Sequence, residues 1–378
     1  MNYQDILFSI IRREALKIEC NDAPLPEFDY ERLYHLSGMH HLSHIVSSFV
    51  KNNNIALPDE LSKKFDVKKN NAVFGSIKQD NVREIIFKIF NEASIEFIPL
   101  KGSVTKNLYP EPWMRISSDI DILVHEEDFD KAVSLLAANG FKISGDRDYH
   151  DISLYLDGVH LELHYNVCEN LEKPDAVLKQ IWENSEKVGG SLFKETDTFF
   201  VFHHIAHMCY HFIFGGCGLI PFIDLYLFEK KLDVNKEKLE KMLEEAGIKQ
   251  FYEKVLLLCE VWFENKKRPE DITDFENYII RNSEYTTKES RGAMLSAYNK
   301  SKASSAASII FPDYEFMSNL YPNLKKHKIL LPFYYIKRIF SKLTQKRQSV
   351  VKRMQRIASQ SDADIEKAAD LLKYVGLE

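Results

Sequence analysis

The sequence predicts an α+β fold in which a small mixed β-sheet follows an N-terminal helical region and precedes a mostly helical C-terminal domain. The β-prone runs are concentrated between Ile95 and Tyr165. Strand, helix, strand, helix, strand and hairpin follow one another there, which favours a mixed sheet with helices on one face. Helical periodicity dominates on both sides. We therefore predict three regions, 1–75, 76–170 and 171–378.

The N-terminal region is predicted to form short helices because its apolar residues recur at helical spacing. The residues that show this spacing are Ile6, Leu7, Ile10 and Ile11, and then Leu42, Ile45, Val46 and Phe49. A longer helix is expected from Gln79 to Ala93, directly before the first strand.

The central region contains the strands, and a strong turn signal fixes two of them. The expected strands are Ile95–Leu100, Asp119–Val124, Phe141–Ser144, Ile152–Leu156 and Val159–Tyr165. Asp157-Gly158 separates the last two and favours a type I′ hairpin turn. A helix is expected over Glu126–Asn139, because Gly140 is a typical residue after a helix end.

The C-terminal region is predicted to be mostly helical from about Pro174. Residues 283–306, rich in Ser, Thr, Lys and Ala, are expected to form a loop or linker. The basic segment 325–356 contains eleven Lys and Arg residues and no Asp or Glu. Apolar residues alternate with these charges. The segment either packs its apolar side on the body of the protein, contacts nucleic acid such as tRNA, or lies on an anionic membrane surface.

Composition and charge exclude several classes of protein. The formal net charge is −6, so the whole chain is not a polycation that coats nucleic acid. Its five cysteines are odd in number and form no Cys-x-x-Cys pair, which argues against a disulfide scaffold or a structural zinc site. The first residues do not resemble a signal peptide, and no window reaches about 18 uncharged apolar residues. We therefore predict a cytoplasmic protein with no transmembrane segment.

Two aspartates on one β-prone run form the first candidate site. Asp119 and Asp121 are two residues apart, so both carboxylates point to the same face of the strand. Their apolar neighbours are expected in the core, and paired charges beside a core are costly without a partner. A divalent cation is a common partner, since Mg²⁺ prefers oxygen ligands. A strand with one solvated polar face is the alternative interpretation of this short motif.

A glycine turn upstream favours phosphate binding. Gly102 follows an apolar strand and precedes a helical turn, so a phosphate can approach the backbone and bind its N–H groups. Ser103 adds a hydroxyl donor, and Lys101 adds a positive charge suited to a triphosphate.

A third carboxylate lies on the second strand of the predicted hairpin. Glu162 shares one face of that strand with His160 and His164, while the apolar residues share the other. If the apolar face is core, Glu162 points outward between two imidazoles. A third carboxylate is what a two-metal phosphoryl-transfer site requires.

Together these motifs resemble a known superfamily. The DNA polymerase β-like nucleotidyltransferases share the pattern hG[GS], Dh[DE]h and h[DE]h, in which h is an apolar residue. This chain is similar in the same order: an apolar strand leads to Gly102-Ser103, Asp119-Ile120-Asp121 follows, and Glu162 lies on a later strand. The stretch LKGSVTKNLYPEPWMRISSDIDILV resembles one branch, the uncharacterised nucleotidyltransferase family. HLELHYNV resembles its later carboxylate strand, with Glu where that branch often has Asp. HHIAHMCYHF, Leu219–Phe228 and LLPFYYIKRIF resemble its C-terminal portion.

The resemblance implies that residues 76–170 are a nucleotidyltransferase core and implies a role for each matching residue. Mg²⁺, or Mn²⁺ in its place, would be bound by Asp119, Asp121 and Glu162. The triphosphate would be held by Lys101, Gly102, Ser103 and Arg115. Glu162 would bind the ion that activates the acceptor hydroxyl and would help to take its proton. The protein would then contribute mainly positioning and charge neutralisation.

Two weaker signals leave alternatives open. His203, His207 and His211 recur at spacing four in a predicted helix, with His204 adjacent. One alternative is a zinc site, and another is a set of histidines that bond to their neighbours and solvent. The third, which the resemblance suggests for His204 and His207, is contact with a substrate phosphate. Asp224 is a lone carboxylate in an apolar run, which requires either a buried ion pair or a place in the active site.

The leading functional hypothesis is transfer of NMP from an NTP to an acceptor hydroxyl, with release of pyrophosphate. The acceptor is a small molecule, a protein or RNA, and a toxin-like transferase acting on tRNA or protein is among these alternatives. A non-catalytic module that binds nucleic acid or protein on the same fold is the rival hypothesis. Transfer of the γ-phosphate, as in a kinase, is the third.

Overall fold

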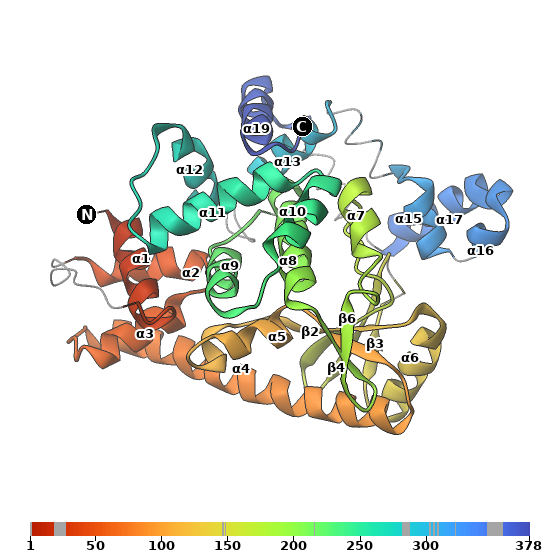
Figure 1. The fold of residues 1–378 in the computed structure, drawn as a ribbon, viewed down its shortest axis with the longest axis horizontal. Helices are drawn as coiled ribbons and strands as arrows, with labels where there is room; N and C mark the ends of the chain where they lie inside the picture. The colour runs from red at the N-terminus through yellow and green to blue at the C-terminus, as the bar shows by residue number, and fades with distance from the viewer. Residues whose placement is uncertain are drawn as a thin grey trace.

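The computed structural model of the protein shows helices arranged around a mixed sheet (Figure 1). The described residues are 2–18, 28–145, 147, 149–214, 216–281, 288–301, 304, 307, 310–321, 323–345 and 358–378. The α+β fold predicted from the sequence is confirmed, with a mixed sheet, helices before it and a mostly helical part after it.

Seven strands form the sheet, in the order β3-β4-β5-β2-β1-β7-β6. The strands are β1 (Phe97–Pro99), β2 (Asp119–Val124), β3 (Lys142–Ser144), β4 (Asp151–Leu156), β5 (Val159–His164), β6 (Ser185–Gly189) and β7 (Leu192–Glu195). β2 and β5 run parallel to each other, and β1 and β4 run antiparallel to them on either side. Asp157 and Gly158 have φ of +51° and +77°, as a type I′ turn between β4 and β5 requires.

One face of the sheet packs against α4 (Asp59–Glu92) and α6 (Phe129–Ala138). In Figure 1 the long helix α4 runs beneath the sheet. Ile120, Ile122 and Val124 point to this side, are at most 2% exposed, and share a core with residues of both helices. Because side chains alternate along β2, its aspartates must point to the opposite face.

The opposite face of the sheet is turned toward the helical part of the chain. Ile98, Leu100 and Leu123 from this face join the large core that the helices build. The N-terminal helices pack on this part too, and Phe8 stacks on Trp262 with ring centroids 4.7 Å apart. The sheet is thus held between two cores, and its polar residues on this face lie between the sheet and the helices.

The remaining helices follow chain order. Before the sheet they are α1 (Tyr3–Glu14), α2 (Tyr30–Met39) and α3 (Ser43–Asn52). Short helical turns inside the sheet region are α5 (Gly102–Thr105), η1 (Lys106–Leu108), η2 (Pro112–Met114) and η3 (Glu126–Asp128). Later helices are α7 (Glu172–Leu178), α8 (Asp197–Phe214), α9 (Ile220–Lys231), α10 (Lys236–Glu245), α11 (Lys249–Phe263), η4 (Glu270–Ile272), α12 (Thr273–Arg281), α13 (Lys288–Tyr298), α15 (Tyr314–Leu320), α16 (Asn323–Lys326), η5 (Lys328–Leu330), α17 (Leu331–Gln345) and α19 (Asp362–Val375).

The sequence did not predict strands β6 and β7. Both are short, and Val188 in β6 is 62% exposed, so neither shows the apolar alternation that marks a half-buried strand. β7 joins the sheet beside β1, where Phe97 pairs with Leu192. The loop expected over residues 283–306 was also wrong in part, because α13 occupies 288–298 and buries Met294 in the helical core.

Part of the apolar side of the basic segment is exposed to solvent in the described residues. Ile329, Phe333 and Ile336 are 89%, 60% and 56% exposed and follow one another at helical spacing across η5 and α17. This exposure contradicts the packing alternative for these residues and leaves the nucleic-acid and membrane alternatives open. Residues 346–356 of the segment lie outside the described residues.

Among the described residues, no helix combines the length and the apolar run that crossing a bilayer requires. The four cysteines in this part, Cys168, Cys209, Cys217 and Cys259, are buried, and no disulfide joins any two of them. Cys20 lies outside the described residues.

Candidate active site

Two neighbouring parallel strands bring the three predicted carboxylates together. Asp121 lies opposite Glu162 in the register of β2 and β5, and Asp119 lies opposite His160 two residues earlier. Alternation therefore places all three carboxylates on one face of the sheet, away from α4 and α6. The Ser117 hydroxyl donates a hydrogen bond to Asp119 Oδ1 over 3.0 Å and holds that side chain. This convergence is the arrangement that a shared cation requires.

The electrostatics of Glu162 reflect this crowding of negative charge. Burial, followed by the charges of Asp121, Asp119 and Asp151, raises the pKa of Glu162 to about 8. Without a cation, a proton on Glu162 therefore relieves the repulsion near neutral pH. Negative charge at this point of the sheet exceeds what the neighbouring side chains neutralise.

Asp121, in contrast, is held in its ionised form by two donors. Lys101 Nζ lies 3.2 Å and His164 Nε2 lies 3.0 Å from Asp121 Oδ1. Burial alone would raise the pKa of Asp121, but the Lys101 charge and the hydrogen bond from His164 lower it below its ordinary range. Burial would likewise lower the pKa of Lys101, but the charges of Asp121, Glu169 and Glu162 raise it. Lys101 is thus a fixed cation beside the carboxylates.

The turn before α5 leaves no room for a side chain at Gly102. A Cβ there would lie 2.8 Å from Arg115 Nη1 and 3.0 Å from Ser117 Oγ. Lys101 before it has φ of +46°, a conformation that costs a non-glycine residue on the order of 1–3 kcal/mol. The turn directs the Lys101 ammonium toward Asp121 and brings backbone close to the carboxylates. The predicted glycine turn is therefore next to the predicted carboxylates.

Arg115 is anchored by a buried ion pair. Its Nε and Nη2 donate to Asp224 Oδ2 over 3.2 and 3.0 Å, and the Tyr109 hydroxyl donates to Asp224 Oδ1 over 2.7 Å. Asp224 is fully buried, so these partners supply the compensation that its charge requires. Of the two roles considered for Asp224, the structure contains the ion pair. Asp224 thereby fixes the position of a guanidinium that lines the same cavity as the three carboxylates.

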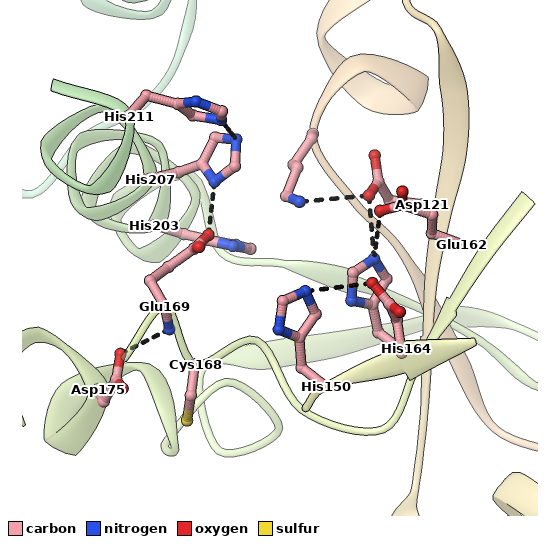
Figure 2. Close-up of polar contacts among 12 residues, drawn as sticks. Asp121, His150, Glu162, His164, Cys168, Glu169, Asp175, His203, His207 and His211 are labelled. Carbon is pink, nitrogen blue, oxygen red and sulfur yellow. Dashed lines mark hydrogen bonds and ion pairs between the residues drawn. The ribbon is translucent and has the colours of Figure 1, made fainter. Parts of the chain in front are cut away.

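Helix α8 faces the carboxylates with a row of histidines and a partner glutamate (Figure 2). His207 Nδ1 lies 2.5 Å from Glu169 Oε1, and His211 Nε2 lies 3.0 Å from His207 Nε2. Burial lowers the pKa of His207 to about 4, so its ring is neutral at neutral pH. A neutral His207 donates from Nδ1 to Glu169 and accepts from His211 at Nε2. The three side chains form one hydrogen-bonded chain across the cavity from Lys101.

The other two histidines of α8 are bonded to protein groups. His203 Nδ1 lies 3.1 Å from Glu195 Oε2, and His204 Nε2 lies 2.9 Å from the Pro221 carbonyl oxygen. Within the described residues, no cluster of three metal-ligating side chains includes a histidine of α8. The row therefore does not form the zinc site that its spacing allowed.

A cavity of about 620 Å³ lies between the sheet and α8. Its volume is within the range of ligand pockets, about 300–1,000 Å³. The predicted site residues that line it are Lys101, Gly102, Arg115, Asp119, Asp121, Glu162, His204 and His207. Ser103 does not line this cavity but a small hollow beside it, which also contains Gly102, Arg115 and Asp119.

The cavity also contains residues that the sequence did not single out. His150, Asp151 and Glu169 line it and come from loops or strand ends around the hairpin. Glu169 accepts the bond from His207, and its backbone N–H donates to Asp175 Oδ1 over 2.8 Å. No periodic pattern marks residues in such loops. Only the fold shows that they face the same space.

The donor atoms suit divalent ions. Asp119, His160 and Glu162 form one group, and Asp121, Glu162 and His164 form another; within each, one ligand atom per residue lies within 4.8 Å of the others. Glu162 belongs to both groups and so lies between them. Carboxylate oxygens are the ligands that Mg²⁺ prefers, and the raised pKa of Glu162 marks uncompensated negative charge. The residues present therefore fit the ions implied by the resemblance.

The mixed sheet and its helical surroundings are consistent with a nucleotidyltransferase core. The sequence model of the uncharacterised nucleotidyltransferase family matches residues 26–264, and the chain belongs to this family. The match spans α2 to α11 and includes every predicted site residue. The resemblance predicted from the motifs is thus confirmed. No curated protein and no solved structure matches the chain.

Proposed function

We propose that the protein transfers NMP from an NTP to an acceptor hydroxyl, with release of pyrophosphate, in a reaction that depends on divalent cations. The observation that carries this proposal is the pairing of Asp121 with Glu162 across β2 and β5, with Asp119 on the same face. Mg²⁺ or Mn²⁺ bound there would polarise the phosphate and stabilise the attacking and leaving oxygens. The three carboxylates would hold these ions at the cavity wall.

Lys101, Gly102 and Arg115 would receive the triphosphate on the wall next to the carboxylates. The Lys101 ammonium lies 3.2 Å from Asp121, so it would neutralise phosphate charge next to the carboxylates that would hold the ions. Arg115 is held in place by its ion pair with Asp224, so it would neutralise phosphate charge without rearranging. Ser103 would contact the terminal phosphate from the adjoining hollow.

Glu162 would bind the metal ion that activates the acceptor hydroxyl, and would help to remove the proton of that hydroxyl. His204 and His207 line the cavity opposite, where each ring already bonds to a protein acceptor. A phosphate beside them would favour their protonated forms, because a nearby negative charge raises the pKa of an imidazole. We propose that they contact substrate in this way.

The acceptor is a small molecule, a protein or RNA. The basic segment 325–356 supports an RNA acceptor only if it binds nucleic acid, which its charge favours. A toxin-like transferase acting on tRNA or protein would use the same site. A non-catalytic binding module would keep the fold, but it has no need of three converging carboxylates.

The test is incubation of the full chain with each α-³²P-labelled NTP, Mg²⁺ and a cell extract, followed by separation of small molecules, RNA and protein. Transfer of label into one fraction supports the proposal and identifies the acceptor class. Asp121→Asn is the matched control and should give background label. Label that appears only from γ-³²P-NTP would establish kinase-like transfer. No incorporation from either nucleotide, while Mg²⁺ binding is measured, would establish the non-catalytic module.

A further inference from the structure

The hairpin that carries Glu162 also builds a second cluster of metal-ligating side chains. Asp151 on β4 lies directly opposite His164 on β5 in the antiparallel register. His150 precedes β4, and its ring is nearly parallel to the ring of His164, with centroids 5.3 Å apart and an angle of 3° between the planes. One donor atom from each of the three residues lies within 4.8 Å of the others. Figure 2 shows both rings below the Asp121 and Glu162 carboxylates.

His164 is oriented in the way that a metal-binding histidine requires. Its Nε2 lies 3.0 Å from Asp121 Oδ1, so Nε2–H donates to a carboxylate. The other nitrogen, Nδ1, then carries a lone pair, yet it is buried and has no hydrogen-bond partner. A histidine that ligates a metal through one nitrogen commonly donates the other N–H to a carboxylate, which fixes its tautomer. The unpartnered Nδ1 of His164 is therefore suited to a cation.

His150 and Asp151 provide the remaining ligands. His150 Nε2 lies 3.2 Å from Asp151 Oδ2, close to the separation of about 3.3–3.6 Å between two ligands of one tetrahedral zinc ion. Both side chains line the active-site cavity, whereas His164 lies beneath them. Three protein ligands would leave a coordination position free, on the side where two of these ligands line the cavity.

We propose that His150, Asp151 and His164 bind a transition-metal ion of the Zn²⁺ type, in a centre separate from the carboxylate site for Mg²⁺. Two imidazoles and one carboxylate suit Zn²⁺ and its neighbours, whereas Mg²⁺ prefers a shell of oxygens. The open position would bind a water molecule or a substrate oxygen, as in zinc sites with three protein ligands. His164 would join the two centres, since its Nε2 lies 3.0 Å from Asp121 Oδ1 and its unpartnered Nδ1 would bind the second ion.

The test uses Co²⁺, which replaces Zn²⁺ and is visible by its d–d absorption. Metal-free full-length protein is titrated with Co²⁺ in excess Mg²⁺, without nucleotide, so the result does not depend on whether nucleotidyl transfer occurs. We expect one Co²⁺ per chain with a nitrogen-ligated spectrum. His150→Ala and Asp151→Asn should each weaken Co²⁺ binding by at least about tenfold, because removing even an outer partner of a ligand costs about that much.

Two control variants distinguish this centre from the carboxylate site and from binding to surface histidines. Glu162→Gln should keep the Co²⁺ spectrum, and so should His327→Ala, which removes an exposed histidine outside the cavity. His150 is 30% exposed, so its replacement should leave the circular dichroism spectrum and the melting temperature of the metal-free protein unchanged. The proposal is wrong if wild type binds no Co²⁺ under excess Mg²⁺, or if His150→Ala binds it as wild type does. The proposal is also wrong if Glu162→Gln alone abolishes binding. In those cases His150 and Asp151 form only an ion pair.

Discussion

Binding of Mg²⁺ should release a proton from Glu162, because burial and neighbouring charges keep this carboxyl protonated near neutral pH in the metal-free protein. Burial and the charges of Asp121, Asp119 and Asp151 raise the pKa of this carboxyl to about 8 in the metal-free protein. At pH 7 it is then protonated in roughly nine molecules of ten, and the ion must displace that proton. We expect release of about 0.9 proton per site at pH 7 and about 0.1 at pH 9. The apparent Mg²⁺ affinity should fall about tenfold for each pH unit below 8.

The release is measured by isothermal titration calorimetry with Mg²⁺ in two buffers of different ionisation enthalpy. Glu162→Gln should release no proton, because it has none to lose. Glu127→Gln, which changes an exposed glutamate outside the cavity, should behave as wild type. Proton release near zero for wild type at pH 7, with Mg²⁺ binding still observed, would refute the reasoning. Glu162 would then be ionised before the ion arrives, or would not contact it.

The same raised pKa predicts how stability depends on pH in the metal-free protein. The folded pKa of Glu162, about 8, is above its ordinary value of 4.5, so the native state keeps a proton that the unfolded chain loses. The contribution of Glu162 to the free energy of unfolding is present in full below pH 4.5 and is lost as the pH rises toward 8. We expect Glu162→Gln to remove this dependence and, in EDTA, to be more stable than wild type at pH 8. The difference is on the order of a few kcal/mol, reduced by the partial exposure of the side chain.

Three further substitutions test other parts of the site. Asp121→Asn should abolish transfer of the α-phosphate label, because asparagine keeps an acceptor oxygen but loses the negative charge. Circular dichroism should show an unchanged fold. Unchanged turnover would place the active site elsewhere. Gly102→Ala puts a methyl group 2.8 Å from Arg115 Nη1, so urea unfolding should show a loss of about 1–3 kcal/mol and the KM for NTP should rise. Gly75→Ala is its control: it lies in α4 with open space around the added Cβ, and should stabilise by about 0.5–1 kcal/mol. Asp224→Ala leaves the Arg115 guanidinium without its buried carboxylate and should cost about 3–5 kcal/mol in urea unfolding; a loss below about 1 kcal/mol would mean that solvent reaches the pair.

Local chemistry explains why much of the candidate site could be predicted from the sequence. Asp119 and Asp121 share a face because alternation along a strand is a property of the backbone, and β2 has the predicted bounds. The hairpin followed from Asp157-Gly158, because both residues tolerate the positive φ that the turn needs.

Other features depend on contacts between distant residues. Strands β6 and β7 exist because Leu192 pairs with Phe97, almost a hundred residues earlier, and their own sequence shows no alternation. The pairing of Glu169 with His207, which joins a loop to α8, has no local signal either.

By itself, the sequence determined the α+β class, the strands β1 to β5 and the choice of candidate site residues, because these follow from periodicity, turn chemistry and residue type over short stretches. Only the tertiary structure decided that Glu162 lies beside Asp121, that Arg115 is fixed by Asp224, and that His150 approaches His164. These are relations between elements. They are set by strand register and by helix packing, in which burial of apolar surface far from the site determines where each polar side chain comes to lie.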